Sequence, residues 1–158
     1  MLYRYVPMQE EYANEIVTNW HYDGIYSFYD MKADKDDLDI FTDKNNWRNI
    51  IFAVLNKKNE LIAWSSYYME DEIVWLALGL KPELTGKGLG EQFVSDCIQF
   101  IKSKSHLNRR IIKLEVALFN QRAIKVYKRV GFTESAKITK STHIGKLDFL
   151  QMTKTCSN

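Results

Sequence analysis

The sequence predicts one α/β (α+β) domain with a sheet of six to seven strands and helices between them. The chain has 158 residues, the usual size of one domain, and 46% of them are hydrophobic, enough for one sizeable core. Strand-length apolar runs alternate with amphipathic stretches that have a helical period. Twice, at 72–104 and at 111–129, a strand-like run leads through a short loop into a helix-like stretch.

The first half of the chain is expected to contain four strands and one helix. The helix is expected over Met8–Asn19, because large apolar residues recur there every four positions. Lys57–Glu60 joins two apolar runs as a turn would. The four strands are expected at Leu2–Val6, Ile50–Asn56, Leu61–Met69 and Glu72–Leu80.

The second half is expected to contain two helices and three strands. A helix over Gly88–Lys104 has apolar residues on one face, and a second over 121–129 follows Asn120, a good N-cap, and precedes Gly131, a good C-terminal stop. Strands are expected at 111–117, Phe132–Ile138 and Lys146–Thr153. We expect the domain to span residues 1–153 and a polar tail to follow at 154–158.

Composition limits the compartment and the partners. The net charge is only +2, so the sequence predicts no nucleic-acid partner and no acidic membrane surface. Cys97 lies on the apolar side of a predicted helix and Cys156 in the predicted tail, so a structural disulfide is not expected. Residues 1–7 lack the pattern of a signal peptide, and no apolar run approaches the length of a membrane span. A cytoplasmic location is therefore predicted.

Three glycines follow the strand expected at Glu72–Leu80. Gly86, Gly88 and Gly90 lie between that strand and the next helix, a sequence order that is typical of phosphate-binding loops. The spacing matches neither a Walker A loop nor a dinucleotide fingerprint. Alone, the loop is a weak signal, and a glycine-rich strand-to-helix turn is the simpler interpretation.

A second motif makes the pattern specific. The pair Thr85–Gly90 and Asn120–Phe132 resembles the GNAT superfamily of acyl-CoA-dependent N-acetyltransferases, whose pattern is Arg/Gln-x-x-Gly-x-Gly/Ala followed by Asn-x-Arg-Ala-x-x-x-Tyr-x-x-x-Gly-Phe. The resemblance extends over roughly residues 50 to 135. One position departs from it, because Thr85 stands where the family has Arg or Gln.

The resemblance implies a fold, a cosubstrate and a set of binding residues. The fold would be a mostly antiparallel mixed sheet that splays between its central strands, with helices on both faces. Acetyl-CoA would be the cosubstrate, with no metal, and Gly79 would mark a bulge that points an N–H group at the thioester carbonyl. The implied acetyl-CoA-binding residues are Leu78, Gly79, Leu80, Thr85, Gly86, Lys87, Gly88, Leu89, Gly90, Glu91, Asn120 and Tyr127.

Two residues are candidates for catalysis. Tyr127 resembles the general acid that protonates the departing CoA thiolate, although it could instead be a core aromatic residue. Glu72 stands in a Glu-Ile-Val-aromatic-x-Ala setting that resembles that of a catalytic Glu in the histone acetyltransferase branch, although it could be a solvated acid in a hairpin. A base matters most for a lysine-like amine, whose pKa is about 10.4. His21, His106 and His143 show no spacing that indicates a metal site or a triad.

The amine acceptor is not identified by the sequence. Aromatic residues crowd Trp20–Asp30, and Asp30–Asp39 carries five Asp against two Lys. This combination suits a cationic amine, but core aromatics beside a solvated acidic loop explain it equally well. Small cationic amines and protein amines both remain as acceptors, and a homodimer is left open. The alternative to an N-acetyltransferase is a non-catalytic acyl-CoA-binding regulatory module with the same fold.

Overall fold

The computed structural model of the protein describes residues 1–47, 50–104 and 111–156, so His106 lies outside it. Seven strands form one mixed sheet in the order β1-β2-β3-β4-β5-β7-β6, which confirms the predicted fold class. The strands are β1 Arg4–Pro7, β2 Ile51–Leu55, β3 Leu61–Glu70, β4 Ile73–Leu80, β5 Ile111–Ala117, β6 Thr133–Thr142 and β7 Gly145–Thr155. The α-helices are α1 Glu10–Asn19, α2 Lys35–Thr42, α3 Gly90–Lys102 and α4 Gln121–Val130, and the 3₁₀ helices are η1 Gly24–Tyr29, η2 Met31–Ala33, η3 Lys44–Asn46 and η4 Pro82–Leu84.

The described residues group into two compact units. The N-terminal unit comprises Tyr3–Ser66 and Leu78–Thr85. The C-terminal unit comprises Met1–Leu2, Tyr67–Ala77 and Gly86–Asn158. Strands β3 and β4 therefore contribute residues to both units. None of the helices in the described part of the chain combines the length and the apolar character that crossing a membrane would require.

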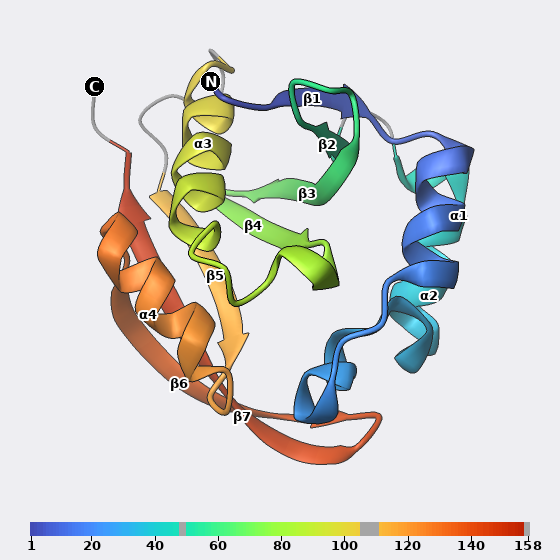
Figure 1. The fold of residues 1–158 in the computed structure, drawn as a ribbon. Helices are drawn as coiled ribbons and strands as arrows, with labels where there is room; N and C mark the ends of the chain where they lie inside the picture. The colour runs from blue at the N-terminus through green and yellow to red at the C-terminus, as the bar shows by residue number, and fades with distance from the viewer. Residues whose placement is uncertain (48–49, 105–110, 157–158) are drawn as a thin grey trace. The chain divides into compact units, whose positions relative to one another are not determined.

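In the N-terminal unit, β1, β2 and β3 form an antiparallel sheet, and α1 packs beside α2 (Figure 1). All five residues of β2 are buried, as expected of a central strand. In the core of this unit, large aromatic residues of the loops and helices pack with residues of the strands. This core includes Ile16, Trp20, Phe41, Trp47 and Ala53.

Helix α2 lies where the sequence suggested only an acidic stretch. The Asp34 carboxylate accepts hydrogen bonds from the backbone N–H groups of Asp36 and Asp37 at 2.9 and 3.1 Å, and so caps the helix. Two acids in the first turn also suit the positive end of the helix dipole. Asp39 forms an exposed i,i+4 ion pair with Lys35 at 3.1 Å. Much of the acidic stretch therefore has a local role in starting and supporting a helix.

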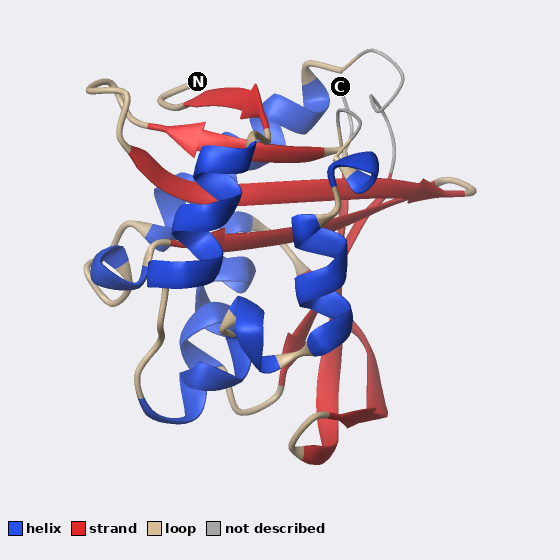
Figure 2. Cartoon of the chain, turned by 90° about the vertical axis from the view of Figure 1, so that its right-hand side faces the viewer, coloured by secondary structure: helices blue, strands red, loops and turns tan. Residues whose placement is uncertain are grey.

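In the C-terminal unit, β5 pairs with β7 and β7 with β6, both antiparallel. The β6–β7 hairpin is a long two-stranded ribbon (Figure 2). Strand β4 runs parallel to β5 through only three pairs and the ladder ends at Trp75–Lys113, although β5 continues to Ala117. This short ladder agrees with the predicted splay of the central strands.

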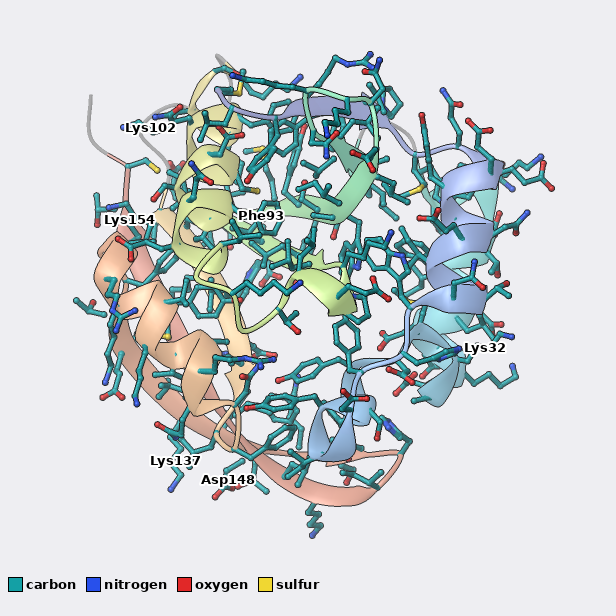
Figure 3. The ribbon with its side chains drawn as sticks, viewed as in Figure 1. Lys32, Phe93, Lys102, Lys137, Asp148 and Lys154 are labelled. Atoms are coloured by element: carbon teal, nitrogen blue, oxygen red, sulfur yellow. The ribbon has the colours of Figure 1, made fainter. Side chains whose placement is uncertain are left out.

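Helices α3 and α4 are neighbours in the C-terminal unit. Phe93 projects from α3 toward the interior and is 1% exposed, whereas Lys102 projects to the outside (Figure 3). The Asp96 carboxylate of α3 is buried and accepts a hydrogen bond from the Leu2 backbone N–H. Strand β7 continues to Thr155 and Cys156 is buried, so Cys156 does not lie in a solvated tail as the sequence suggested.

Candidate functional site

The glycine loop of the C-terminal unit has an unusual backbone. Gly86 and Gly88 adopt φ angles of +72° and +77°, which residues other than glycine rarely adopt. Helix α3 begins directly afterwards, at Gly90, and the N-cap residue Leu89 provides no side-chain cap. The first N–H groups of an α-helix have no intrahelical acceptor, and the helix dipole adds partial positive charge there. The loop and the start of α3 therefore have the backbone character of an anion-binding site.

Helix α4 packs against this loop. A β-carbon at Gly90 would lie 3.4 Å from Cγ2 of Val126, an ordinary van der Waals distance, so the start of α3 lies beside α4. One turn earlier on α4, Nη1 of Arg122 lies 3.5 Å from the place of a β-carbon at Gly86. Residues 122 and 126 lie on the same helix face. The structure therefore brings a guanidinium group to the glycine loop.

The two predicted ends of α4 are confirmed. Oδ1 of Asn120 accepts a hydrogen bond from the Ala123 N–H at 3.2 Å, and Gly131 is left-handed at φ +108°. The ring of Tyr127 is half-buried and packs edge-on against Phe132, with ring centroids 5.9 Å apart. The Cγ2 atom of Val126, the residue before Tyr127, lies 3.4 Å from the place of a β-carbon at Gly90. Gly86–Glu91, Asn120 and Tyr127 thus belong to one packed unit formed by α3, α4 and their leading loops.

Glu72 lies elsewhere in the same unit. It is an exposed residue of the turn between β3 and β4, and its backbone carbonyl accepts a hydrogen bond from the N–H of Ile111, the first residue of β5, at 3.2 Å. Asn120 follows the last residue of β5. The six steps from Ile111 to Ala117, at about 3.3 Å each, separate the two ends of β5 by roughly 20 Å. The structure does not bring Glu72 together with Asn120, and the role of Glu72 as a base stays a prediction.

The end of β4 belongs to the N-terminal unit. The N–H of Lys81 donates to the Ile62 carbonyl of β3 at 2.9 Å, so the backbone groups of Lys81 and Gly79 face β3. Strand backbone groups alternate between edges, so Leu78 and Leu80 present theirs on the opposite edge. The pairing of Leu78, Gly79 and Leu80 with pantetheine stays a prediction.

Gly79 has a different requirement. A β-carbon at this position would lie 2.3 Å from Nε1 of Trp64, far inside contact distance. The indole of Trp64, which packs edge-on against Phe41, therefore covers the strand at Gly79 and excludes any side chain there. This steric contact explains the glycine without the predicted bulge, and no sequence pattern indicated it.

The aromatic segment of the N-terminal unit is attached to the end of β4. The Tyr22 hydroxyl donates to the Leu80 carbonyl oxygen at 2.7 Å. Burial, together with the charges of Asp30 and Glu83, raises the pKa of Tyr22 above its ordinary value of 10.0, so the phenol stays a hydrogen-bond donor. Oδ1 of Asp30 accepts the Tyr22 N–H at 2.8 Å, and its Oδ2 lies 3.4 Å from Nδ1 of His21.

The aromatic residues of this segment differ in burial. Trp20 is 2% exposed and belongs to the core. Tyr22, Tyr26, Phe28 and Tyr29 are only half-buried, and the Phe28 and Tyr29 rings meet edge-on with centroids 5.1 Å apart. These four side chains are therefore partly accessible. Among the described residues, no three His, Cys, Asp or Glu side chains gather closely enough to hold a metal ion.

Comparisons with known proteins agree with this fold. Over 53 residues the chain is 38% identical to an uncharacterized N-acetyltransferase from Methanocaldococcus jannaschii, a match that covers 34% of this chain and only 22% of that relative. The fold is similar to that of a spermidine N-acetyltransferase from Vibrio cholerae in complex with CoA and spermine, with a TM-score of 0.73, 17% identity, and 98% and 96% of the two chains covered.

A second solved structure has the same fold. It is the ribosomal-protein-S5-alanine acetyltransferase from Vibrio fischeri, with a TM-score of 0.65, 15% identity, and 100% and 95% of the two chains covered. Residues 14–132, well over half of the chain, match the model of the acetyltransferase (GNAT) family. The protein is therefore a member of the acetyltransferase (GNAT) family.

Proposed function

We propose that this protein transfers an acetyl group from acetyl-CoA to a primary amine by direct attack in a ternary complex. The observation that carries the proposal is the left-handed glycine loop at an α3 start without a side-chain cap, packed against α4. Such a start binds anions through backbone N–H groups, and the pyrophosphate of acetyl-CoA is the anion expected in this family.

The donor would be held by backbone groups along its length. The loop and the first turn of α3, residues 86–91, would bind the pyrophosphate. The edge of β4 at Leu78 and Leu80, which faces away from β3, would pair with the amide groups of pantetheine. An N–H on that edge would stabilise the negative charge that develops on the thioester oxygen.

The reaction needs one proton removed and one supplied. The neutral amine attacks the thioester carbonyl carbon, the C–S bond breaks as the amide forms, and the nitrogen releases one proton to solvent, from which the Tyr127 phenol is protonated again after it has served the thiolate. Tyr127 would donate its phenolic proton to the departing thiolate, since a phenol with an ordinary pKa near 10 stays protonated at neutral pH. The ring contact with Phe132 would hold the phenol in place.

The amine would be deprotonated without Glu72, whose carboxylate lies in an exposed turn. Removing a proton at pH 7 from an amine with a pKa of about 10.4 requires roughly 4.6 kcal/mol. For an α-amine with a pKa near 7.8 the requirement is only about 1.1 kcal/mol. We propose that the enzyme uses the free amine present in solution. Turnover at low acceptor concentration should therefore rise with the fraction of the acceptor that is unprotonated.

The acceptor proposed is a small cationic amine of the polyamine class. The half-buried aromatic residues at 22–29 would offer ring faces to a cation, and Asp30 carries a carboxylate next to them in the sequence. The spermidine N-acetyltransferase with the same fold supports this class. The alanine acetyltransferase supports a protein α-amine as the competing choice.

A cytoplasmic location is part of the proposal, because both buried cysteines are free thiols. A homodimer stays a prediction.

Release of the CoA thiol tests the proposal. The protein is incubated with acetyl-CoA and with spermidine, a lysine ester or a peptide that begins with alanine, and the thiol is measured. We expect release with spermidine well above that without an acceptor, and a mass increase of one acetyl group on the amine. Binding of acetyl-CoA without release for any amine would instead indicate the regulatory module. Release only with the alanine peptide would overturn the polyamine class.

A further inference from the structure

We propose that a second copy of this chain packs on the outer face of the C-terminal unit, around a two-fold axis that passes over β4. The inference goes beyond the proposed function, because this surface has no role in the proposed reaction. The outer face is formed by the side chains of β4, β5 and the end of β3 that point away from the core. Its residues are Tyr68, Glu70, Ile73, Trp75, Ile111 and Lys113.

The two central strands of this unit have one buried and one partly exposed face. Val74 of β4 and Ile112 of β5 are both 0% exposed and belong to the core. The residues on either side of each are half-buried. Because successive side chains of a strand point to opposite faces of the sheet, these half-buried residues share the face away from the core.

The centre of the outer face is apolar. Ile73 of β4 is in register with Ile111 of β5. Two residues along β4, the ring of Trp75 is stacked on Tyr68 of β3, with centroids 6.5 Å apart and an interplanar angle of 17°. Tyr68 is 54% exposed, and no group among the described residues accepts a hydrogen bond from the buried indole N–H of Trp75. Accessible aromatic rings beside aliphatic side chains are typical of the centre of a protein interface.

Two charges of opposite sign flank this apolar centre. Glu70 follows Tyr68 by two residues on β3, so it lies on the same face. Partial burial and then the charge of Glu70 raise the pKa of Tyr68, as expected if the carboxylate lies near the phenol. Lys113 is in register with Trp75 on β5. Within the described part of the chain, neither Glu70 nor Lys113 forms a hydrogen bond or an ion pair.

The positions of these charges suit a two-fold axis. Strand β4 lies between β3 and β5, so the midpoint between Glu70 and Lys113 falls on β4, between Ile73 and Trp75. Two strand spacings of about 4.8 Å and two residues of about 3.3 Å separate the two charges by roughly 12 Å. A two-fold axis above this midpoint, parallel to the sheet and perpendicular to the line between the charges, places Glu70 of each copy opposite Lys113 of the other. Two ion pairs would then flank a shared apolar centre.

The balance of charge on the outer face indicates which partner it fits. The face carries one unpaired anion and one unpaired cation, so it is complementary to itself. A partner surface of one sign, acidic or basic, would place one of the two charges against a like charge. A second copy of the chain pairs both charges at once, because one contact is repeated by the symmetry.

Charge reversal tests the proposal. Analytical ultracentrifugation of the whole chain over a range of concentrations gives the dissociation constant of the dimer. Glu70→Lys and Lys113→Glu should each raise it by at least about tenfold, since each change brings two pairs of like charges into the interface. The control Lys125→Glu makes the same charge change on an exposed position of α4 and should alter the constant by less than about threefold. Circular dichroism shows whether each variant is folded.

Mixing the two single variants identifies the contact. In a heterodimer of Glu70→Lys with Lys113→Glu, both contacts join opposite charges, so an equal mixture should dimerise about as tightly as the wild type. If the folded variants do not associate when mixed, or if the reversals leave the wild-type dimer unchanged, the outer face is not the interface and the proposal is wrong. A wild type that stays monomeric at its highest soluble concentration also overturns it. Release of the CoA thiol is measured separately and decides the proposed function.

Discussion

The hydroxyl of Tyr22 and the carbonyl oxygen of Leu80 are joined by a 2.7 Å hydrogen bond between residues 58 positions apart in the sequence. The bond attaches the aromatic segment to the end of β4. Because Leu80 offers its carbonyl on the edge away from β3, the tyrosine satisfies a group that no β3 partner can reach. The same bond fixes the start of the segment proposed to receive the amine.

Replacing Tyr22 should change the alkaline limit of stability. The folded pKa of Tyr22 lies above the unfolded value of 10.0, so its stabilisation is complete below pH 10 and is lost as pH rises through the folded pKa. Tyr22→Phe should cost about 1 kcal/mol at pH 8, because one hydrogen bond is removed. Above pH 10 the wild type should lose about 1.4 kcal/mol per pH unit more than the variant. Urea unfolding midpoints of the wild type and of Tyr22→Phe, measured from pH 8 to pH 11, test both expectations. If the stabilities of the two proteins change with pH in the same way, the role of this phenol is contradicted.

Substitutions at Gly88 should separate charge from backbone strain. The residue has φ +77°, and among the described residues, its two chain neighbours aside, no atom lies within 4 Å of a β-carbon placed there. Asn and Asp tolerate left-handed backbone better than other side chains and have nearly the same shape. Gly88→Asn should fold and retain measurable acetyl-CoA binding, whereas Gly88→Asp should abolish it by placing a negative charge at the pyrophosphate. Equal affinities of the two variants in calorimetry would remove this loop as the phosphate site.

Tyr127→Phe should reduce turnover without loss of donor binding. The variant keeps the ring that packs on Phe132 and removes only the proton donor. General-acid assistance contributes about 10²- to 10⁴-fold, so kcat should fall within or below that range. The affinity for acetyl-CoA should change by less than about threefold. Wild-type turnover under conditions where the chemical step limits the rate would show that another group protonates the thiolate.

Glu72→Gln should leave the pH–rate profile unchanged. The carboxylate lies in an exposed turn beside the start of β5, whereas Asn120 follows the end of that strand. With a polyamine acceptor, kcat/KM should rise with pH in both proteins, because the fraction of free amine rises. Initial rates between pH 6.5 and 9 give the comparison. A loss confined to the low-pH side of the Glu72→Gln profile would restore Glu72 as the base.

The sequence predicted the elements whose signals are local. The β2–β3 hairpin, the N-cap Asn120 and the stop at Gly131 are confirmed, because each depends on neighbours within a few residues. Helix α2 was missed because its eight residues are too short and too acidic for a clear apolar period. Its cap, Asp34, was a local signal that could have indicated it.

The contacts that shape the candidate site could be predicted only in part. Tyr22 lies in the aromatic stretch that the sequence showed, but its partner Leu80 is distant in sequence, and the two meet only through packing. Glu72 was favoured for its neighbours along the chain, which do not reveal at which end of a strand a residue lies. Side-chain periodicity also does not indicate which backbone edge faces a partner strand, so Gly79 and Leu80 were not distinguished.

The contact between Gly79 and Trp64 has a consequence for the history of the family. An indole that comes within 2.3 Å of a β-carbon site makes two positions, fifteen residues apart, a single inherited unit. In homologues of this chain, any residue larger than glycine at position 79 should therefore accompany a smaller residue at position 64. A library that varies both codons together should recover such pairs, whereas variation at position 79 alone should return glycine.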